Sequence, residues 1–259
     1  MYFYLDKDYK SDFNDYYTQS EYFSVMKQML ERRNYCSVEY VDAKGLVSVM
    51  SDPDAAVLFV SGALPDTVHG ENDSLFKKWM DLGGTVYWCG PEIGRYVSST
   101  DGVKDLGSEK GFFGGKVNTD EKDAHAYNES AMFRYTHTRY DGSLYGIKAD
   151  AENSLPLAYV SDSGYSSVSA VKLFNGNAII FGGNIATTET VYNVLMDRTY
   201  CADLMICGLT YRSSGLYSGN GTVNGSVSGS FKISVSEDMT FFIAAGEPSS
   251  HWAKAIELN

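Results

Sequence analysis

The stretch GGTVYWCGPEIGRY, residues 83–96, decides how the chain around it is folded. Its first part is an apolar, β-branched and aromatic run ending at Cys89, which is typical of a buried strand. Gly-Pro-Glu then breaks the strand, and Pro91 suits the first position of a following helix. The stretch therefore predicts a strand over 85–89, a sharp corner at the cysteine and a helix over 91–99.

The residues before this stretch alternate between strand-like and helix-like segments. In chain order they predict a strand over 1–6, a helix over 20–35 capped at Ser20, a strand over 37–42, a short helix over 43–52, a strand over 55–62 and a helix over 73–84 capped at Asp73 or Ser74. Strands joined by helices at this spacing form a parallel sheet. The fold class is therefore α/β, a three-layer α/β/α, flavodoxin-like domain with a mainly parallel sheet.

The second half of the chain is less regular. Residues 100–150 are an irregular excursion with short pieces of structure, in which GFFGG is expected as a loop with Phe112 and Phe113 tucked in, or as a protein contact if they are exposed. Two or three strands follow, with the NGN at 175–177 predicting a hairpin, and then a long helix over 187–209. A Gly/Ser-rich linker and a small C-terminal β appendage with strands near 231–236, 240–246 and 252–259 complete the chain, so we expect two domains, 1–210 and 211–259.

The composition limits the possible partners. The chain has 259 residues, 44% of them hydrophobic, and its 21 basic and 33 acidic residues give a net charge of -12. Nucleic acids and anionic membranes favour a basic face, so we expect no nucleic-acid partner and no membrane insertion. The 20 tyrosines suit half-exposed surfaces that contact sugars or proteins. A protein or carbohydrate ligand and a homo-oligomer remain open.

The cysteines show neither metal-site nor disulfide-framework spacing. Cys36, Cys89, Cys201 and Cys207 include no CxxC pair, so we expect no metal site and no cofactor. The start of the chain, MYFYLDKDYK, becomes charged too early for a signal peptide. Four glycosylation sequons occur, at Asn72, Asn128, Asn220 and Asn224, and localisation stays open between an extracellular or cell-surface location and the cytoplasm.

The order of elements also resembles a known superfamily. With FKKWMDLGGTVYWCG at 76–90 and NGNAIIFGGN at 175–184, residues 1–210 resemble the class I glutamine amidotransferase-like superfamily, whose relatives include ThuA-like proteins and the trimerisation domains of some glycosidases. In active members a Gly-x-Cys-x-Gly turn carries the nucleophile. The resemblance therefore implies that Cys89 lies at or next to the nucleophile position.

The chain departs from that active pattern where the chemistry would occur. Trp88 precedes the cysteine and Pro91 lies two residues after it, where the active pattern has glycines that allow a strained turn. The stretch FGGNIATTE has Asn184 where active members carry a His-x-Glu motif. We therefore interpret the chain as a non-catalytic binding or assembly module. The resemblance implies a place for it beside carbohydrate-active or cell-surface domains.

Two enzymatic readings stay open beside it. In the first, Cys89 serves a hydrolase or amidotransferase with His125 or His137 as its base, because a thiolate needs a basic partner. In the second, a metal- or carboxylate-dependent hydrolase uses His69, Glu71 and Glu92.

The loops after the strands over 55–62 and 85–89 predict a ligand crevice. Ligands of open α/β sheets bind at the carboxyl ends of the strands, where these two loops meet. The ligand-contact residues expected there are Asp66, His69, Glu71, Glu92 and Arg95.

Overall fold

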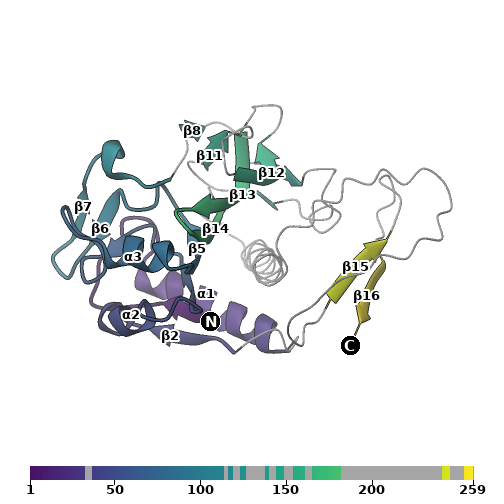
Figure 1. Cartoon of the computed structure of the whole chain (residues 1–259), viewed down its shortest axis with the longest axis horizontal. Helices are drawn as coiled ribbons and strands as arrows, with labels where there is room; N and C mark the ends of the chain where they lie inside the picture. The colour runs from purple at the N-terminus through teal and green to yellow at the C-terminus, as the bar shows by residue number, and fades with distance from the viewer. Residues whose placement is uncertain are drawn as a thin grey trace.

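A parallel sheet lies at the centre of the computed structural model, which describes residues 1–32, 37–113, 116–118, 123–126, 138–139, 144–148, 154–160, 165–181, 241–245 and 254–258 (Figure 1). Its strand order is β2 (Glu39–Val41), β1 (Tyr2–Tyr4), β3 (Ala56–Phe59), β5 (Thr85–Cys89) and β14 (Gly176–Phe181). Neighbouring strands in this series pair in parallel. The expected α/β fold is confirmed.

Helices connect these strands as the sequence predicts, although α1 begins earlier than expected. α1 (Tyr16–Arg32) leads from β1 to β2, α2 (Ala43–Val49) leads to β3, and α3 (Leu75–Asp81) precedes β5. The cap of α1 is Asp15 and not Ser20, because the Asp15 carboxylate accepts a hydrogen bond from the Thr18 backbone N–H at 2.7 Å. A helix begins where a polar side chain accepts hydrogen bonds from its first free backbone N–H groups. Asp15 accepts such a bond, so α1 begins before Ser20.

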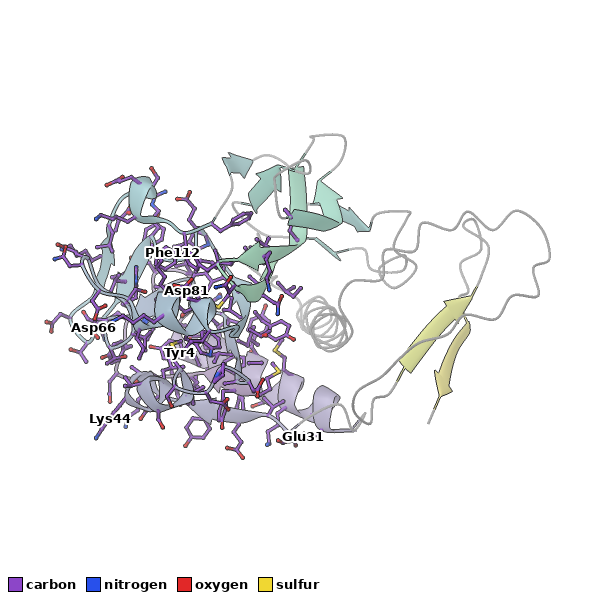
Figure 2. The ribbon with its side chains drawn as sticks, viewed as in Figure 1. Tyr4, Glu31, Lys44, Asp66, Asp81 and Phe112 are labelled. Carbon is purple, nitrogen blue, oxygen red and sulfur yellow. The ribbon has the colours of Figure 1, made fainter. Side chains whose placement is uncertain are left out.

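Side chains of the central strands alternate between the two faces of the sheet. On one face the Phe3 ring contacts Phe23 of α1, with 5.5 Å between ring centroids. On the other face Phe59 and Trp88, 5.6 Å apart, belong to the core that contains Phe76 of α3. Figure 2 shows Tyr4 of β1 in the interior of this part of the molecule and Lys44 of α2 at its periphery. Helices thus cover both faces of the parallel strands, which explains why β3 and β5 are apolar without alternation.

The chain does not form a helix after Cys89, so the helix expected over 91–99 is wrong. A turn leads instead into β6 (Tyr96–Ser98), which pairs with β4 (Leu64–Pro65) and β7 (Val103–Asp105) in a second, small sheet. Gly90 at φ +137° and Gly94 at φ +85° occupy left-handed backbone conformations, which interrupt a right-handed helix. A Cβ at Gly90 would also lie 2.7 Å from the Gly62 Cα, so this corner is closely packed.

Beyond β14 the sheet becomes antiparallel. The expected hairpin is confirmed, since β14 pairs with β13 (Tyr165–Leu173) across a turn at Phe174 and Asn175. The sheet continues through these strands: β12 (Ser154–Val160), β9 (Asp123–Ala126) and β10 (Thr138–Arg139). β11 (Leu144–Lys148) pairs with β13, and β8 (Lys116–Asn118) pairs with β11. The central sheet is therefore mixed, with a parallel core and an antiparallel extension.

The C-terminal segment contributes a two-stranded antiparallel sheet, β15 (Phe241–Ala245) with β16 (Lys254–Leu258). These strands match those expected near 240–246 and 252–259. The helix expected over 187–209 and the strand over 231–236 lie outside the described residues. Among the helices in the described part of the chain, none is both long and apolar enough to cross a bilayer.

Candidate functional site

The loops that follow β3 and β5 meet at the carboxyl edge of the sheet. The Asp66 backbone N–H donates to the Ser98 carbonyl at 2.9 Å. His69 Nε2 lies 2.8 Å from the Gly94 carbonyl oxygen. The Gly94 position requires glycine, because a Cβ there would lie 2.8 Å from the Phe112 ring at a φ of +85°. Two loops that are distant in sequence are thus held together by backbone and imidazole contacts.

His69 is a buried, fully bonded side chain. It is 4% exposed, and its Nδ1 lies 2.9 Å from the Ser74 hydroxyl. Because the Gly94 carbonyl can only accept, Nε2 carries the proton and Nδ1 accepts from Ser74. Burial lowers the pKa of His69, although the hydrogen bond to Gly94 opposes this shift. The imidazole is therefore neutral at pH 7, with both ring nitrogens engaged.

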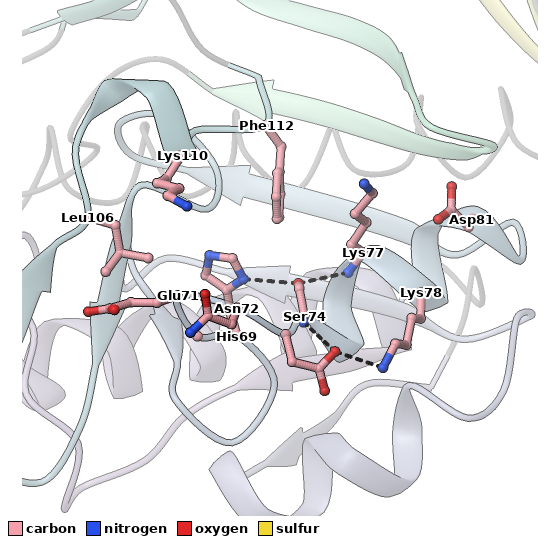
Figure 3. A pocket seen from close by; sticks show the side chains of 12 residues that line it. His69, Glu71, Asn72, Ser74, Lys77, Lys78, Asp81, Leu106, Lys110 and Phe112 are labelled. Carbon is pink, nitrogen blue, oxygen red and sulfur yellow. Dashed lines mark hydrogen bonds and ion pairs between the residues drawn. The ribbon is translucent and has the colours of Figure 1, made fainter.

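Beside His69 lies an open pocket of about 400 Å³. Three segments form its wall: the loop after β4, the α3 helix and the segment that contains the 3-10 turn η1 (Ser108–Lys110). Figure 3 shows the lining side chains facing this space. The lining residues are His69, Gly70, Glu71, Asn72, Asp73, Ser74, Lys77, Lys78, Asp81, Leu106, Lys110 and Phe112.

Ion pairs hold two of the pocket carboxylates. Glu71 pairs with Lys104 of β7, and this ammonium lowers the pKa of the Glu71 carboxyl. Asp73 pairs with Lys78 at 2.7 Å, and this hydrogen bond is the largest cause of the lowered pKa of Asp73. Both carboxylates are ionised at neutral pH, so neither is a proton donor in this range.

Phe112 supplies an aromatic surface to the pocket. Its ring stacks on Phe76 with 6.0 Å between centroids and an interplanar angle of 5°. Its ring also meets His69 at 5.0 Å and Phe174 at 5.4 Å in edge-to-face contacts. Phe112 and Phe113 are partly buried against the core, which confirms the expectation that both aromatic rings are tucked in.

Three of the five residues expected in the crevice lie outside the pocket. Asp66 accepts a hydrogen bond from the Tyr9 hydroxyl at 2.8 Å, and burial, followed by this bond, raises the pKa of Tyr9 to about 12. Arg95 binds Asp105 through two nitrogens, at 3.0 and 2.8 Å, and Glu92 at 3.5 Å. Only His69 and Glu71 of the predicted set line the cavity.

The Arg95 ion pair has a clear electrostatic consequence. Hydrogen bonds from Arg95 lower the pKa of the Asp105 carboxyl to about 2. The same ion pair links the start of β6 to the end of β7, because Arg95 directly precedes β6 and Asp105 ends β7. Arg95 therefore binds a structural partner, Asp105, and does not line the pocket.

His69, Glu71 and Glu92 do not form a joint acid or metal site. His69 bonds to Ser74 and Gly94, whereas Glu92 pairs with Arg95. Within the described part of the chain, no group of three or more histidine, cysteine, aspartate or glutamate side chains is arranged to hold a metal ion.

Cys89 ends β5 and is buried, with 2% of its surface exposed. His125 lies on β9, and β12, β13 and β14 separate β9 from β5. Four strand spacings amount to roughly 19 Å, which is beyond the reach of an imidazole, so the structure does not bring His125 to Cys89. His137 lies outside the described residues.

Sequence reasoning foresaw Ser74 only as a helix cap and did not select the lysines of the pocket. The acidic loop ENDS at 71–74, followed directly by Lys77 and Lys78, was the available signal. No sequence pattern indicated that Lys110 belongs to the site, because only the folded chain brings η1 against this loop.

Comparisons with known proteins place the chain in no family. No protein-family model and no curated protein matches it. Among solved structures, the GH42 β-galactosidase Gan42B from G. stearothermophilus is similar over 79% of this chain and 29% of its own, at 14% identity and a TM-score of 0.47. The cytoplasmic protein STM1381 from Salmonella typhimurium LT2 is similar over 81% of this chain and 98% of its own, at 13% identity and a TM-score of 0.48.

A further similar structure is the exo-β-1,4-mannosidase Op5Man5 from Opitutaceae bacterium strain TAV5. The likeness covers 82% of this chain and 34% of that protein, at 10% identity and a TM-score of 0.43. The chain thus spans less than a third of Gan42B and about a third of Op5Man5. A function for the chain rests on the geometry of its own pocket.

Proposed function

We propose that this chain is a binding or assembly module and that the pocket beside His69 takes a small polar ligand of the carbohydrate class. The observation that carries the proposal is the hydrogen-bonded bridge from Ser74 through His69 to the Gly94 carbonyl. This bridge uses both imidazole nitrogens for structure. It also shapes one wall of the cavity.

The chemistry of the lining supports a sugar as the ligand. Sugars carry many hydroxyl groups that both donate and accept hydrogen bonds, together with apolar C–H faces. The exposed Asn72 amide offers a donor and an acceptor, and the lysine and carboxylate side chains around it add more of each. The Phe112 ring provides the apolar surface on which a C–H face can pack.

Two features, one at His69 and one at Cys89, support binding in preference to catalysis. The pKa of His69 is lowered by burial, and its acceptor nitrogen already accepts a hydrogen bond from the Ser74 hydroxyl. Cys89 is buried, and its corner continues into β6, whereas an activated nucleophile is held up on a strand-to-helix turn.

A ligand titration followed by NMR tests the proposal. Monosaccharides and disaccharides added to the full chain should shift the amide signals of residues 69–74 and 106–112 in a saturable way. Asn72→Ala should weaken that binding severalfold, because it removes an amide that lines the pocket. The matched control is Lys44→Ala, an exposed α2 residue at the periphery of the fold that does not line the pocket (Figure 2).

Two results would overturn the proposal. One is the absence of any saturable shift across the sugar panel. The other is turnover of a sugar, amide or ester substrate that Cys89→Ser abolishes, which would make the chain a cysteine-dependent enzyme.

A further inference from the structure

We infer that the pocket selects sugars that carry a carboxylate, with Lys110 as the residue that contacts it. This inference rests on the proposed function, since it names the ligand class of the same site. It follows from how the charges around the pocket are shared, and from where the remaining ammonium group lies.

The pocket acids are already supplied with positive partners. Glu71 is paired with Lys104, and Lys110 lies close enough to stabilise the same carboxylate further. Asp73 is paired with Lys78. Glu71 thus has two ammonium groups near it on the η1 side of the pocket, and its ion pair is with Lys104. Glu109, next to Lys110 on η1, turns its carboxylate over Gly107.

Lys110 is the ammonium group available on that side. It is exposed on η1, lines the pocket, and forms no ion pair with any residue that the structure describes. Lys77 differs, because its Nζ lies 5.1 Å from the centre of the Phe174 ring. In Figure 3, Asp81 is drawn beyond Lys77, on the side away from Lys110. Among the described residues, Lys110 is therefore the lining ammonium group that no side chain binds directly.

The geometry places this charge beside the aromatic surface. Figure 3 shows Lys110 on one side of Phe112 and Lys77 on the other, above the loop that carries Asn72. A sugar ring packed on Phe112 would present a substituent to Lys110. An ammonium group favours a carboxylate there over a neutral hydroxymethyl group.

The net charge of the chain gives this unpaired lysine its significance. At -12, the molecule as a whole repels anions at long range. An unpaired lysine in the pocket attracts anions, although the surrounding charges repel them. Because the Debye length at physiological salt is short, this attraction acts only in the pocket itself.

Matched probes separate charge from shape. Glucuronate and galacturonate differ from glucose and galactose only at C6, where a carboxylate replaces a hydroxymethyl group. In NMR titrations of the full chain at low salt, each uronate should bind about 1.5-fold to fivefold tighter than its neutral parent, the range expected for one exposed ion pair. The preference should shrink at 150 mM NaCl and above.

Variants assign the effect to Lys110. Lys110→Gln should make each uronate bind no tighter than its neutral parent measured on the same variant, and Lys110→Arg should retain the uronate preference. Lys44→Gln, which removes an equal charge outside the pocket, should leave the preference intact. Circular dichroism of each variant verifies folding.

The outcomes distinguish this inference from the proposed function. Equal binding of uronates and neutral parents, or a preference that survives Lys110→Gln, overturns the carboxylate inference and leaves sugar binding in place. Absence of binding by all four sugars overturns the proposed function, and this inference with it.

Discussion

At the level of single residues, His69 shows how a residue with catalytic potential is used for structure. A histidine in a strand-exit loop is a natural candidate for acid–base chemistry. Here burial favours the neutral ring, which bonds to the Ser74 hydroxyl on one side and to the Gly94 carbonyl on the other. Its partners span two loops, so its main effect is to fix the wall of the pocket.

His69→Leu should lower the free energy of unfolding by about 1–3 kcal/mol, because it leaves the Ser74 hydroxyl and the buried Gly94 carbonyl without their partner. Urea denaturation of both proteins at pH 7 measures the difference. Equal midpoints and slopes would show that the bridge contributes nothing to stability.

The same residue predicts a pH dependence of stability. Because the pKa of folded His69 lies below its ordinary value of about 6.5, the unfolded chain binds the proton more readily. The contribution is complete above that ordinary value and is lost as the pH falls below it. The stability difference between the parent and His69→Leu should therefore shrink from pH 7 to pH 5. A difference that grows in this interval would contradict the assignment.

Cys89 should resist alkylation in the folded protein. With 2% of its surface exposed, its sulfur is shielded from iodoacetamide. Peptide mass spectrometry after labelling at pH 6 to 8.5 should find Cys89 unmodified until denaturant is added. Rapid modification near pH 6 would indicate an activated thiolate and would support the enzymatic reading.

At the level of elements, α3 and the turn after β5 determine the site together. Ser74 caps α3 by accepting the Lys77 backbone N–H at 3.1 Å, while its hydroxyl proton points to His69. The turn after β5 supplies the Gly94 carbonyl in a conformation that glycine tolerates. A short helix and a turn thereby hold the pocket wall without any residue of the sheet itself.

Ser74→Ala should destabilise the protein more than an ordinary loss of a helix cap, which costs about 1 kcal/mol. The substitution removes both the α3 cap and a partner of His69, so a loss of about 2 kcal/mol is expected. Ser48→Ala, at an exposed position of α2, is the matched control and should change the midpoint little. Equal effects of the two substitutions in urea melts would refute the double role.

At the level of the whole molecule, the parallel strands form the most protected part of the described structure. Val57 and Leu58 of β3 and Val86 and Tyr87 of β5 are 0% exposed, because helices cover both faces of these strands. β2 lies at the end of the strand order and exposes Tyr40. Stability should therefore be distributed unevenly across the sheet.

Hydrogen exchange followed by mass spectrometry checks this distribution. Amides of β3 and β5 should exchange most slowly, and those of β2 and β7 considerably faster, since interior strands open only in the least frequent, most global unfolding events. Exchange in β2 as slow as in β3 would indicate that another surface covers the edge strand.

Several elements could be predicted because their causes are local. The apolar runs over 55–62 and 85–89 specify buried strands, and Ser74 specifies a helix start, through residues that are neighbours in sequence. The Asn-Gly pair at 175–176 predicted the hairpin, although the turn residues are Phe174 and Asn175 and Gly176 already pairs with Leu173. The helix predicted after Cys89 failed because positive φ angles at Gly90 and Gly94 depend on how closely this corner approaches Gly62 and Phe112.

The sequence by itself determined the alternation of strands and helices and the apolar centre of the sheet, since periodicity and capping act over a few residues. Only the tertiary structure decided the site. The contact of His69 with Gly94 and the approach of Lys110 to Glu71 each join residues 25 or more positions apart. Such contacts depend on which loops the topology brings to one edge of the sheet, and no local pattern in the chain encodes that proximity.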